Sequence, residues 1–206
     1  MRERIEGCPC CVGEADQALI HSRPLRELTA DDHNHYMFNA MFTWGDEDDF
    51  RHFLPRLLEL AVADTDWTGD PERVLGFLAY GKWDTWPKHE QVAIESLVRS
   101  VWNAGLTLDH SQFEADGWLC GIGRAGLDVI SFIDGWRRLG ASSTLGQVAE
   151  FLSWNSELLT DGTLTNAFWR DVEKRDVVAA ELRDWLGVCL EDPEFRDRLA
   201  AWYERT

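Results

Sequence analysis

The chain has 206 residues, of which 45% are hydrophobic and 12% aromatic, so it can bury a substantial core and is not expected to be disordered. Its formal net charge of −17 repels phosphate backbones and anionic lipids, which argues against nucleic-acid and membrane partners. The charge favours either solubility alone or a basic protein partner. No apolar run reaches the ~20 residues of a membrane-spanning helix, and no secretory signal is recognised.

Residues 1–13 precede the first helical pattern and are interpreted as a separate cysteine-containing tail. Cys8, Cys10 and Cys11 lie in the run Cys-Pro-Cys-Cys. A Cys-x-x-Cys spacing lets two thiolates bind one Zn²⁺, and structural zinc sites have four ligands. Completing the set would need Cys10 and a histidine, for which His21, His33 and His35 stay open. The whole chain has five scattered cysteines, which favours reduced thiols and a cytoplasmic location.

The first two predicted helices cover residues 14–21 and 30–42. Thr29 is a candidate N-cap of the second, and two acidic residues occupy its first turn. Asp32, His35 and Asn39 share one face of this helix because they are spaced three and four residues apart. That face is an alternative metal-linked site.

A helix predicted over 46–63 contains Pro55, which should kink or restart it. Its leucines make it similar to the first helix of a HEAT-type repeat, although no second copy follows at a fixed period. The run Thr43-Trp-Gly-Asp46, followed by Asp48-Asp-Phe-Arg-His-Phe-Leu-Pro-Arg-Leu-Leu-Glu-Leu60, resembles a block shared by uncharacterised bacterial proteins of similar length. Those proteins also share an N-terminal cysteine pair, and the resemblance implies a bacterial, cytoplasmic, helical protein without implying an activity.

Residues 46–72 hold nine Asp or Glu against two Arg, and several tryptophans lie in or near this segment. Acidic residues at a helix start are favoured by the helix dipole, which explains the first turn. Acids beside aromatic residues also suit a surface that binds a basic protein, although tryptophans are at least as often core residues. The candidate partner-binding residues are Asp46, Asp48, Asp49, Asp64, Asp66, Trp67, Asp70, Trp83 and Trp86.

The remaining helices are marked by local signals. Asp70-Pro71 and Asp192-Pro193 each pair an N-cap with a proline at the first helical position. Gly105 is expected to end a helix over 88–104. The further predicted helices are 71–82, 112–120, 126–139, 144–159, 163–170, 173–190 and 193–204.

The run from Gly121 through Gly123 to Gly126 spells a dinucleotide-binding fingerprint, but no buried strand precedes it. These glycines are therefore expected in a close helix crossing or a turn. No strand is predicted anywhere, so the fold class is all-α: an irregular multi-helix bundle or a stack of antiparallel helical pairs, HEAT-like in part. Residues 14–206 are expected to form one helical domain.

No catalytic residue is nominated, because neither a nucleophile-elbow motif nor a phosphate-binding loop is present. The favoured function is an acidic, helical binder of a basic protein, such as an inhibitor or immunity protein for a basic toxin such as a nuclease. The alternatives are a zinc-binding enzyme or sensor, using Cys8, Cys10 and Cys11 or the Asp32/His35 face, and a helical scaffold with several partners.

Overall fold

The computed structural model is all-helical, as the sequence predicts. It describes residues 4–63, 67, 69–165 and 172–205. Within these residues no strand forms, and the only extended pairings are isolated bridges at Trp44. No helix in the described residues is both long and apolar enough to cross a membrane. The chain divides at Thr85 and Trp86 into two compact units.

In its described part the first unit, residues 1–85, contains four α-helices whose starts follow their capping residues. Thr29 and Asp32 form a reciprocal capping box, with Asp32 accepting the Thr29 amide at 2.8 Å. Asp70 accepts the amide of Arg73 at 2.8 Å and precedes a proline. The elements are α1 Glu14–Ile20, α2 Ala30–Asn39, α3 Glu47–Ala63 and α4 Pro71–Tyr80, with short 3-10 turns at Leu25–Glu27 and Trp83–Thr85.

Aromatic rings from α2 and α3 form the core of the first unit. Tyr36 lies 4.7 Å from Phe53 and 5.4 Å from Trp44 between ring centroids, and all three are buried. Helix α3 continues through Pro55, so the restart expected at this proline does not occur. Ile5 is fully buried as well, so residues 4–13 pack into this unit instead of forming a separate tail.

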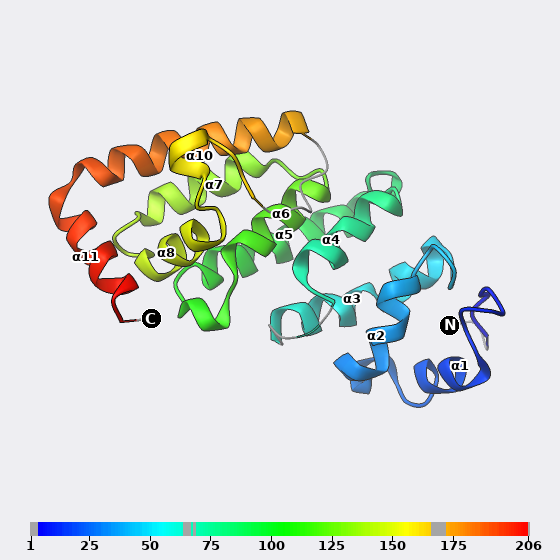
Figure 1. Cartoon of the computed structure of the whole chain (residues 1–206). Helices are drawn as coiled ribbons and strands as arrows, with labels where there is room; N and C mark the ends of the chain where they lie inside the picture. The colour runs from blue at the N-terminus through cyan, green and yellow to red at the C-terminus, as the bar shows by residue number, and fades with distance from the viewer. Residues whose placement is uncertain (1–3, 64–66, 68, 166–171, 206) are drawn as a thin grey trace. The chain divides into compact units, whose positions relative to one another are not determined.

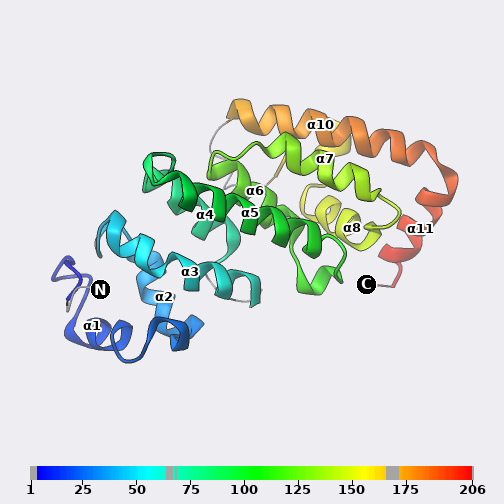
Figure 2. The ribbon, with the colours of Figure 1, turned by 180° about the vertical axis from the view of Figure 1, so that it is seen from behind.

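The second unit, residues 86–206, holds seven α-helices in its described part. Helix α10 packs along α7, and both views show the two side by side (Figure 1, Figure 2). The helix expected over 163–170 lies largely outside the described residues, and a short helix precedes it instead. The elements are α5 Lys88–Gly105, α6 Ala115–Arg124, α7 Val129–Leu139, α8 Leu145–Trp154, α9 Leu158–Asp161, α10 Val172–Glu191 and α11 Pro193–Tyr203, with a 3-10 turn at His110–Gln112.

Trp102 organises the core of the second unit. Its ring is fully buried and meets those of Phe132 and Trp136 edge to face, and its indole N–H donates to the Phe132 carbonyl at 3.0 Å. Gly105 is the last residue of α5, where the ring of Phe113 leaves no room for an added Cβ. Close packing, more than helix termination, therefore explains this glycine.

The glycine run of the fingerprint begins inside a helix, which extends past the end predicted at residue 120. Gly121 and Gly123 are inside α6, and Gly126 turns the chain with a φ of 79°. A dinucleotide site requires a buried strand leading into this run. The residues before Gly121 are helical, so the run is not such a site.

Candidate metal centre

Cys8, Cys10 and Cys11 form a tight group of thiols at the surface of the first unit. The Cys8 and Cys10 sulfurs are 2.8 Å apart, the Cys10 and Cys11 sulfurs are 3.7 Å apart, and all three lie within 4.8 Å of one another. Cys10 is exposed, whereas Cys8 and Cys11 are half-buried. No other His, Cys, Asp or Glu in the described part of the chain joins this group. The three thiols predicted as metal ligands are thus brought together.

A hydrogen-bonded turn creates this arrangement. The amides of Cys11 and Val12 both donate to the Cys8 carbonyl at 2.9 Å, which folds the chain back over Cys8. The hydrogen bond from the Cys10 thiol lowers the pKa of Cys8 below its usual range, and the amides of Cys10 and Cys11 act in the same direction. The same interaction with Cys8 raises the pKa of Cys10 to about 11. The turn therefore favours a thiolate at Cys8.

Backbone hydrogen bonds fix the segment that leads into the turn. The Cys8 amide donates to the Thr43 carbonyl, and the Gly45 amide donates to the Glu6 carbonyl, both at 2.7 Å. Between these bonds, Gly7 lies against Trp44, whose ring would be 3.3 Å from an added Cβ. The segment is thus held against the residues that connect α2 to α3.

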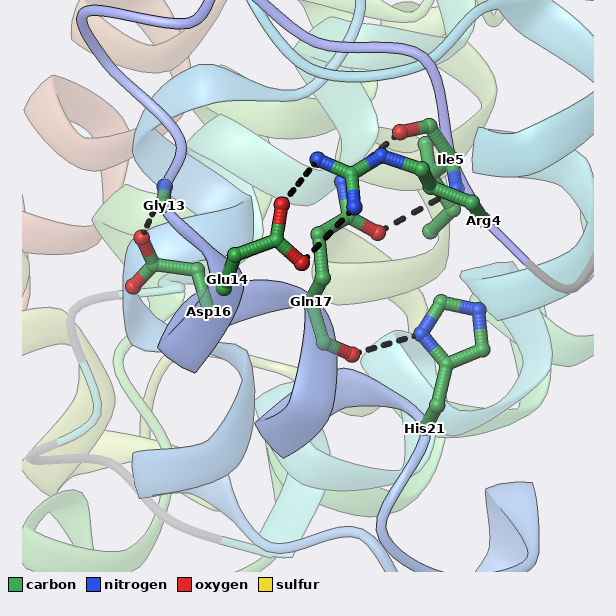
Figure 3. A network of polar contacts seen from close by, with 7 residues as sticks. All are labelled: Arg4, Ile5, Gly13, Glu14, Asp16, Gln17 and His21. Carbon is green, nitrogen blue, oxygen red and sulfur yellow. Dashed lines mark hydrogen bonds and ion pairs between the residues drawn. The ribbon is translucent and has the colours of Figure 1, made fainter.

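A second set of contacts ties the segment to α1 (Figure 3). The side-chain amide of Gln17 donates to the Ile5 carbonyl at 2.7 Å and accepts the Ile5 amide at 3.2 Å, in a buried reciprocal pair. Arg4 forms an exposed ion pair with Glu14. None of these contacts involves a sulfur atom. The residues before the turn are therefore held in place without a metal ion.

His35 lies on α2 and is paired with Asp16 of α1. The Nδ1 atom of His35 is 2.7 Å from Asp16 Oδ1, and this hydrogen bond lowers the pKa of Asp16. The partner proposed for His35 from the sequence was Asp32. Asp32 caps α2, and its Oδ2 atom lies 3.6 Å from Arg23 Nε, so the alternative Asp32/His35 site stays a prediction.

The acidic residues predicted to bind a partner act largely as helix caps. Asp46 and Asp49 exchange amide-to-carboxylate hydrogen bonds of 3.1 and 3.2 Å at the start of α3. Asp70 caps α4, whereas Asp48 is exposed in the first turn of α3. The remaining two residues, Asp64 and Asp66, lie outside the described residues.

The predicted partner-binding tryptophans are buried. The indole N–H of Trp67 donates to the Ala30 carbonyl at 3.1 Å and to Asn34 Oδ1 at 2.8 Å, so Trp67 fastens its segment to α2. Trp83 and Trp86 are also buried, in the first and second unit respectively. These rings are not available at the surface as anchors for a partner.

Three aromatic residues missed by the sequence analysis are exposed on the first unit. Phe38, Phe42 and Tyr80 are 54%, 61% and 53% exposed, and the rings of Phe42 and Tyr80 are 4.7 Å apart. The guanidinium of Arg73 lies 4.4 Å from the centre of the Phe38 ring. The spacing of four residues between Phe38 and Phe42 was the available signal, but it does not distinguish a surface pair from a core pair.

Comparisons with known proteins give no relative from which a function could be transferred. No family model matches the chain. No curated protein and no solved structure matches it either. The three clustered cysteines and the exposed aromatic residues must therefore be interpreted from their own chemistry.

Proposed function

We propose that this protein binds one thiophilic metal ion, Zn²⁺ in the first instance, through Cys8, Cys10 and Cys11. The observation that carries the proposal is the convergence of three sulfurs within 4.8 Å on a hydrogen-bonded turn. Thiolates are the ligands that zinc prefers among soft donors, whereas calcium and magnesium take oxygen. A further support is the stabilised thiolate at Cys8, because a metal binds the deprotonated sulfur.

The sulfur positions fit zinc after small movements. A tetrahedral zinc ion with bonds of about 2.3 Å holds its sulfurs about 3.8 Å apart. The separations here are 2.8 and 3.7 Å, with the third no more than 4.8 Å. Each sulfur therefore needs to move by about 1 Å or less, which side-chain rotation of an exposed cysteine can supply.

The metal is proposed to act on a unit that is already folded. The residues before the turn are fixed by backbone bonds from Cys8 and Gly45 and by the Ile5–Gln17 pair. A structural zinc site, in contrast, contributes the folding energy of its domain. We therefore assign the metal a functional role, as in a sensor, and expect the metal-free protein to remain folded.

The test is metal analysis of protein expressed without a histidine tag and purified under reducing conditions. The wild type should hold close to one equivalent of zinc, and Cys8→Ser and Cys11→Ser should lose it. Cys189→Ser is the matched control, since Cys189 is also partly accessible but belongs to α10 of the second unit. A folded wild type that takes up no zinc when one equivalent is supplied would refute the proposal.

A second candidate function is the binding of a basic protein, in the manner of an inhibitor or immunity protein. The specific observation that favours it is the exposure of Phe38, Phe42 and Tyr80, of which Phe42 and Tyr80 are in ring contact. The first unit contains seventeen Asp and Glu against eight Lys and Arg, so it attracts cationic proteins at long range. Arg73 over Phe38 exemplifies the cation–π contact that an incoming Lys or Arg could make.

The binder proposal is tested with the double variant Phe38→Ser/Phe42→Ser. We expect a basic protein to bind the wild type stoichiometrically in an extract of the native host, to dissociate as salt rises, and to be lost from the double variant. Val188→Ser in α10 is the control, because Val188 is 67% exposed and lies in the second unit. If the basic protein binds the wild type, the double variant and Val188→Ser equally, then Phe38 and Phe42 are not part of the contact surface. For either function we propose a cytoplasmic location, supported by the five free cysteines.

A further inference from the structure

We infer that His35 is the fourth ligand of the zinc site, bound through Nε2, and that Asp16 is the residue that positions it. This inference rests on the thiolate site proposed above. Together with the three cysteines, His35 would complete a Cys₃His set, which gives zinc the four nitrogen and sulfur ligands of a tetrahedral site. The sequence alone left His21, His33 and His35 as equivalent choices for this position.

The first observation is the hydrogen bond between His35 and Asp16. Metal-bound histidines almost always donate their other ring N–H to a carboxylate or a carbonyl, which fixes the tautomer and the ring orientation. Asp16 Oδ1 accepts from His35 Nδ1 at 2.7 Å, which leaves the lone pair of Nε2 available to a metal. The pair therefore has the arrangement of a carboxylate–histidine–metal unit.

The second observation is that two independent contacts connect this pair to the cysteine turn. After the turn, the other carboxylate oxygen of Asp16 accepts the amide of Gly13 at 2.7 Å, two residues beyond Cys11. Before the turn, the His35 ring lies 5.7 Å from that of Trp44, and Trp44 contacts Gly7. His35 is thus bracketed by the residues on both sides of Cys8–Cys11.

The other two histidines are held at other places in the first unit. His33 is fully buried on the face of α2 that meets Phe53, and its Nδ1 lies 2.9 Å from the Thr29 carbonyl. His21 follows the last residue of α1, and its Nδ1 lies 2.7 Å from the Gln17 carbonyl. The turn, in contrast, leads into the first residue of α1. His21 follows the other end of this seven-residue helix, about 10 Å away.

Metal binding must bring the turn and His35 closer together, because His35 is not part of the group of atoms within 4.8 Å. The side chain of His35 is 42% exposed, so a metal ion held by the turn can reach it while the bond to Asp16 is kept. A neutral imidazole is also the favourable fourth donor for charge reasons. It leaves the zinc centre with one negative charge, whereas a fourth thiolate would give two in a unit that is already acidic.

The test is X-ray absorption of zinc-loaded protein together with zinc affinities from chelator competition. The wild type should show three sulfurs at about 2.3 Å and one imidazole nitrogen at about 2.0 Å. In His35→Gln the imidazole signal should disappear while the three sulfurs stay, and the zinc affinity should fall at least tenfold. Asp16→Asn should keep the imidazole signal and lose affinity by about 10- to 100-fold.

His21→Gln is the matched control and should retain the spectrum and the affinity of the wild type. Circular dichroism of each variant without metal establishes that it is folded. Three sulfurs with an oxygen in the wild type, or an unchanged affinity in His35→Gln, would overturn the assignment of His35 and leave the thiolate site standing. A wild type that binds no zinc at all would overturn both proposals.

Discussion

The order in which the cysteines react is a direct test of the electrostatics of the turn. In metal-free, reduced protein, exposure alone predicts that Cys10 is alkylated first, because it is the most accessible of the three thiols. The hydrogen bonds predict the reverse for Cys8 and Cys10, because the thiolate is the reactive form and Cys10 holds its proton. We therefore expect iodoacetamide at pH 7 to modify Cys8 well before Cys10.

The size of the effect follows from the thiolate fractions. With a pKa of about 11, Cys10 is about 0.01% thiolate at pH 7, compared with about 3% for an ordinary cysteine of pKa about 8.5. This lowers its rate about 300-fold. A more basic thiolate is intrinsically more nucleophilic, and a Brønsted coefficient of about 0.4–0.5 returns a factor of about 10 to 20. The net expectation is that Cys10 reacts about 20-fold more slowly than an ordinary exposed cysteine.

The assay is substoichiometric alkylation followed by fragment-ion mass spectrometry, which separates the three positions within one peptide. The variant Cys8→Ser provides the internal control, because the hydrogen bond with Cys8 is the largest cause of the raised pKa of Cys10. Cys10 should become about tenfold more reactive in that variant. Preferential modification of Cys10 in the wild type, or no acceleration in Cys8→Ser, would refute the reasoning.

Two further predictions concern stability, measured by chemical denaturation. Gly105→Ala forces a Cβ against the ring of Phe113 and should cost about 1–3 kcal/mol, whereas Gly187→Ala, with no atom within 4 Å in α10, should add about 0.5–1 kcal/mol; equal effects would contradict the packing argument. Burial lowers the pKa of His33, whose Nε2 finds no partner among the described residues. Its neutral form therefore stabilises the fold above about pH 6.5, and this contribution falls as pH drops below that value, by at most about 1.4 kcal/mol per unit. His33→Gln should reduce the loss of stability between pH 7.5 and 5.5, and an unchanged pH dependence would contradict the assignment.

Helix positions were predictable because their signals are local. Thr29 with Asp32, and Asp70 with Pro71, specify helix starts within four residues of sequence, and the structure has α2 and α4 beginning there. The end of α5 at Gly105 was also predicted, but for a different reason. The ring of Phe113, eight residues away, excludes a side chain at that position, and such a packing contact is not encoded in the spacing of residues.

The candidate site was predictable only in part for the same reason. The cysteine spacing marks Cys8, Cys10 and Cys11 within four residues, whereas the choice among the histidines depends on the pairing of His35 with Asp16, nineteen residues earlier. Burial is likewise a tertiary property. Acidic residues near tryptophans are as typical of a partner surface as of a core. The structure has Trp67 inside the first unit, hydrogen-bonded to α2.

The two proposed functions differ in their response to salt, because only the binding of a basic partner should weaken as salt rises. A net charge of −17 attracts zinc ions and basic proteins alike, but attraction across solvent is screened beyond about 10 Å at 0.1 M ionic strength. Coordination by thiolates acts over bond lengths of about 2.3 Å and is not screened. Between 0.05 and 0.5 M salt we therefore expect a basic partner to dissociate while the zinc content of dialysed protein stays at one equivalent. Zinc lost in step with the partner would mean that the ion is held by the acidic surface, and that the three cysteines are not its ligands.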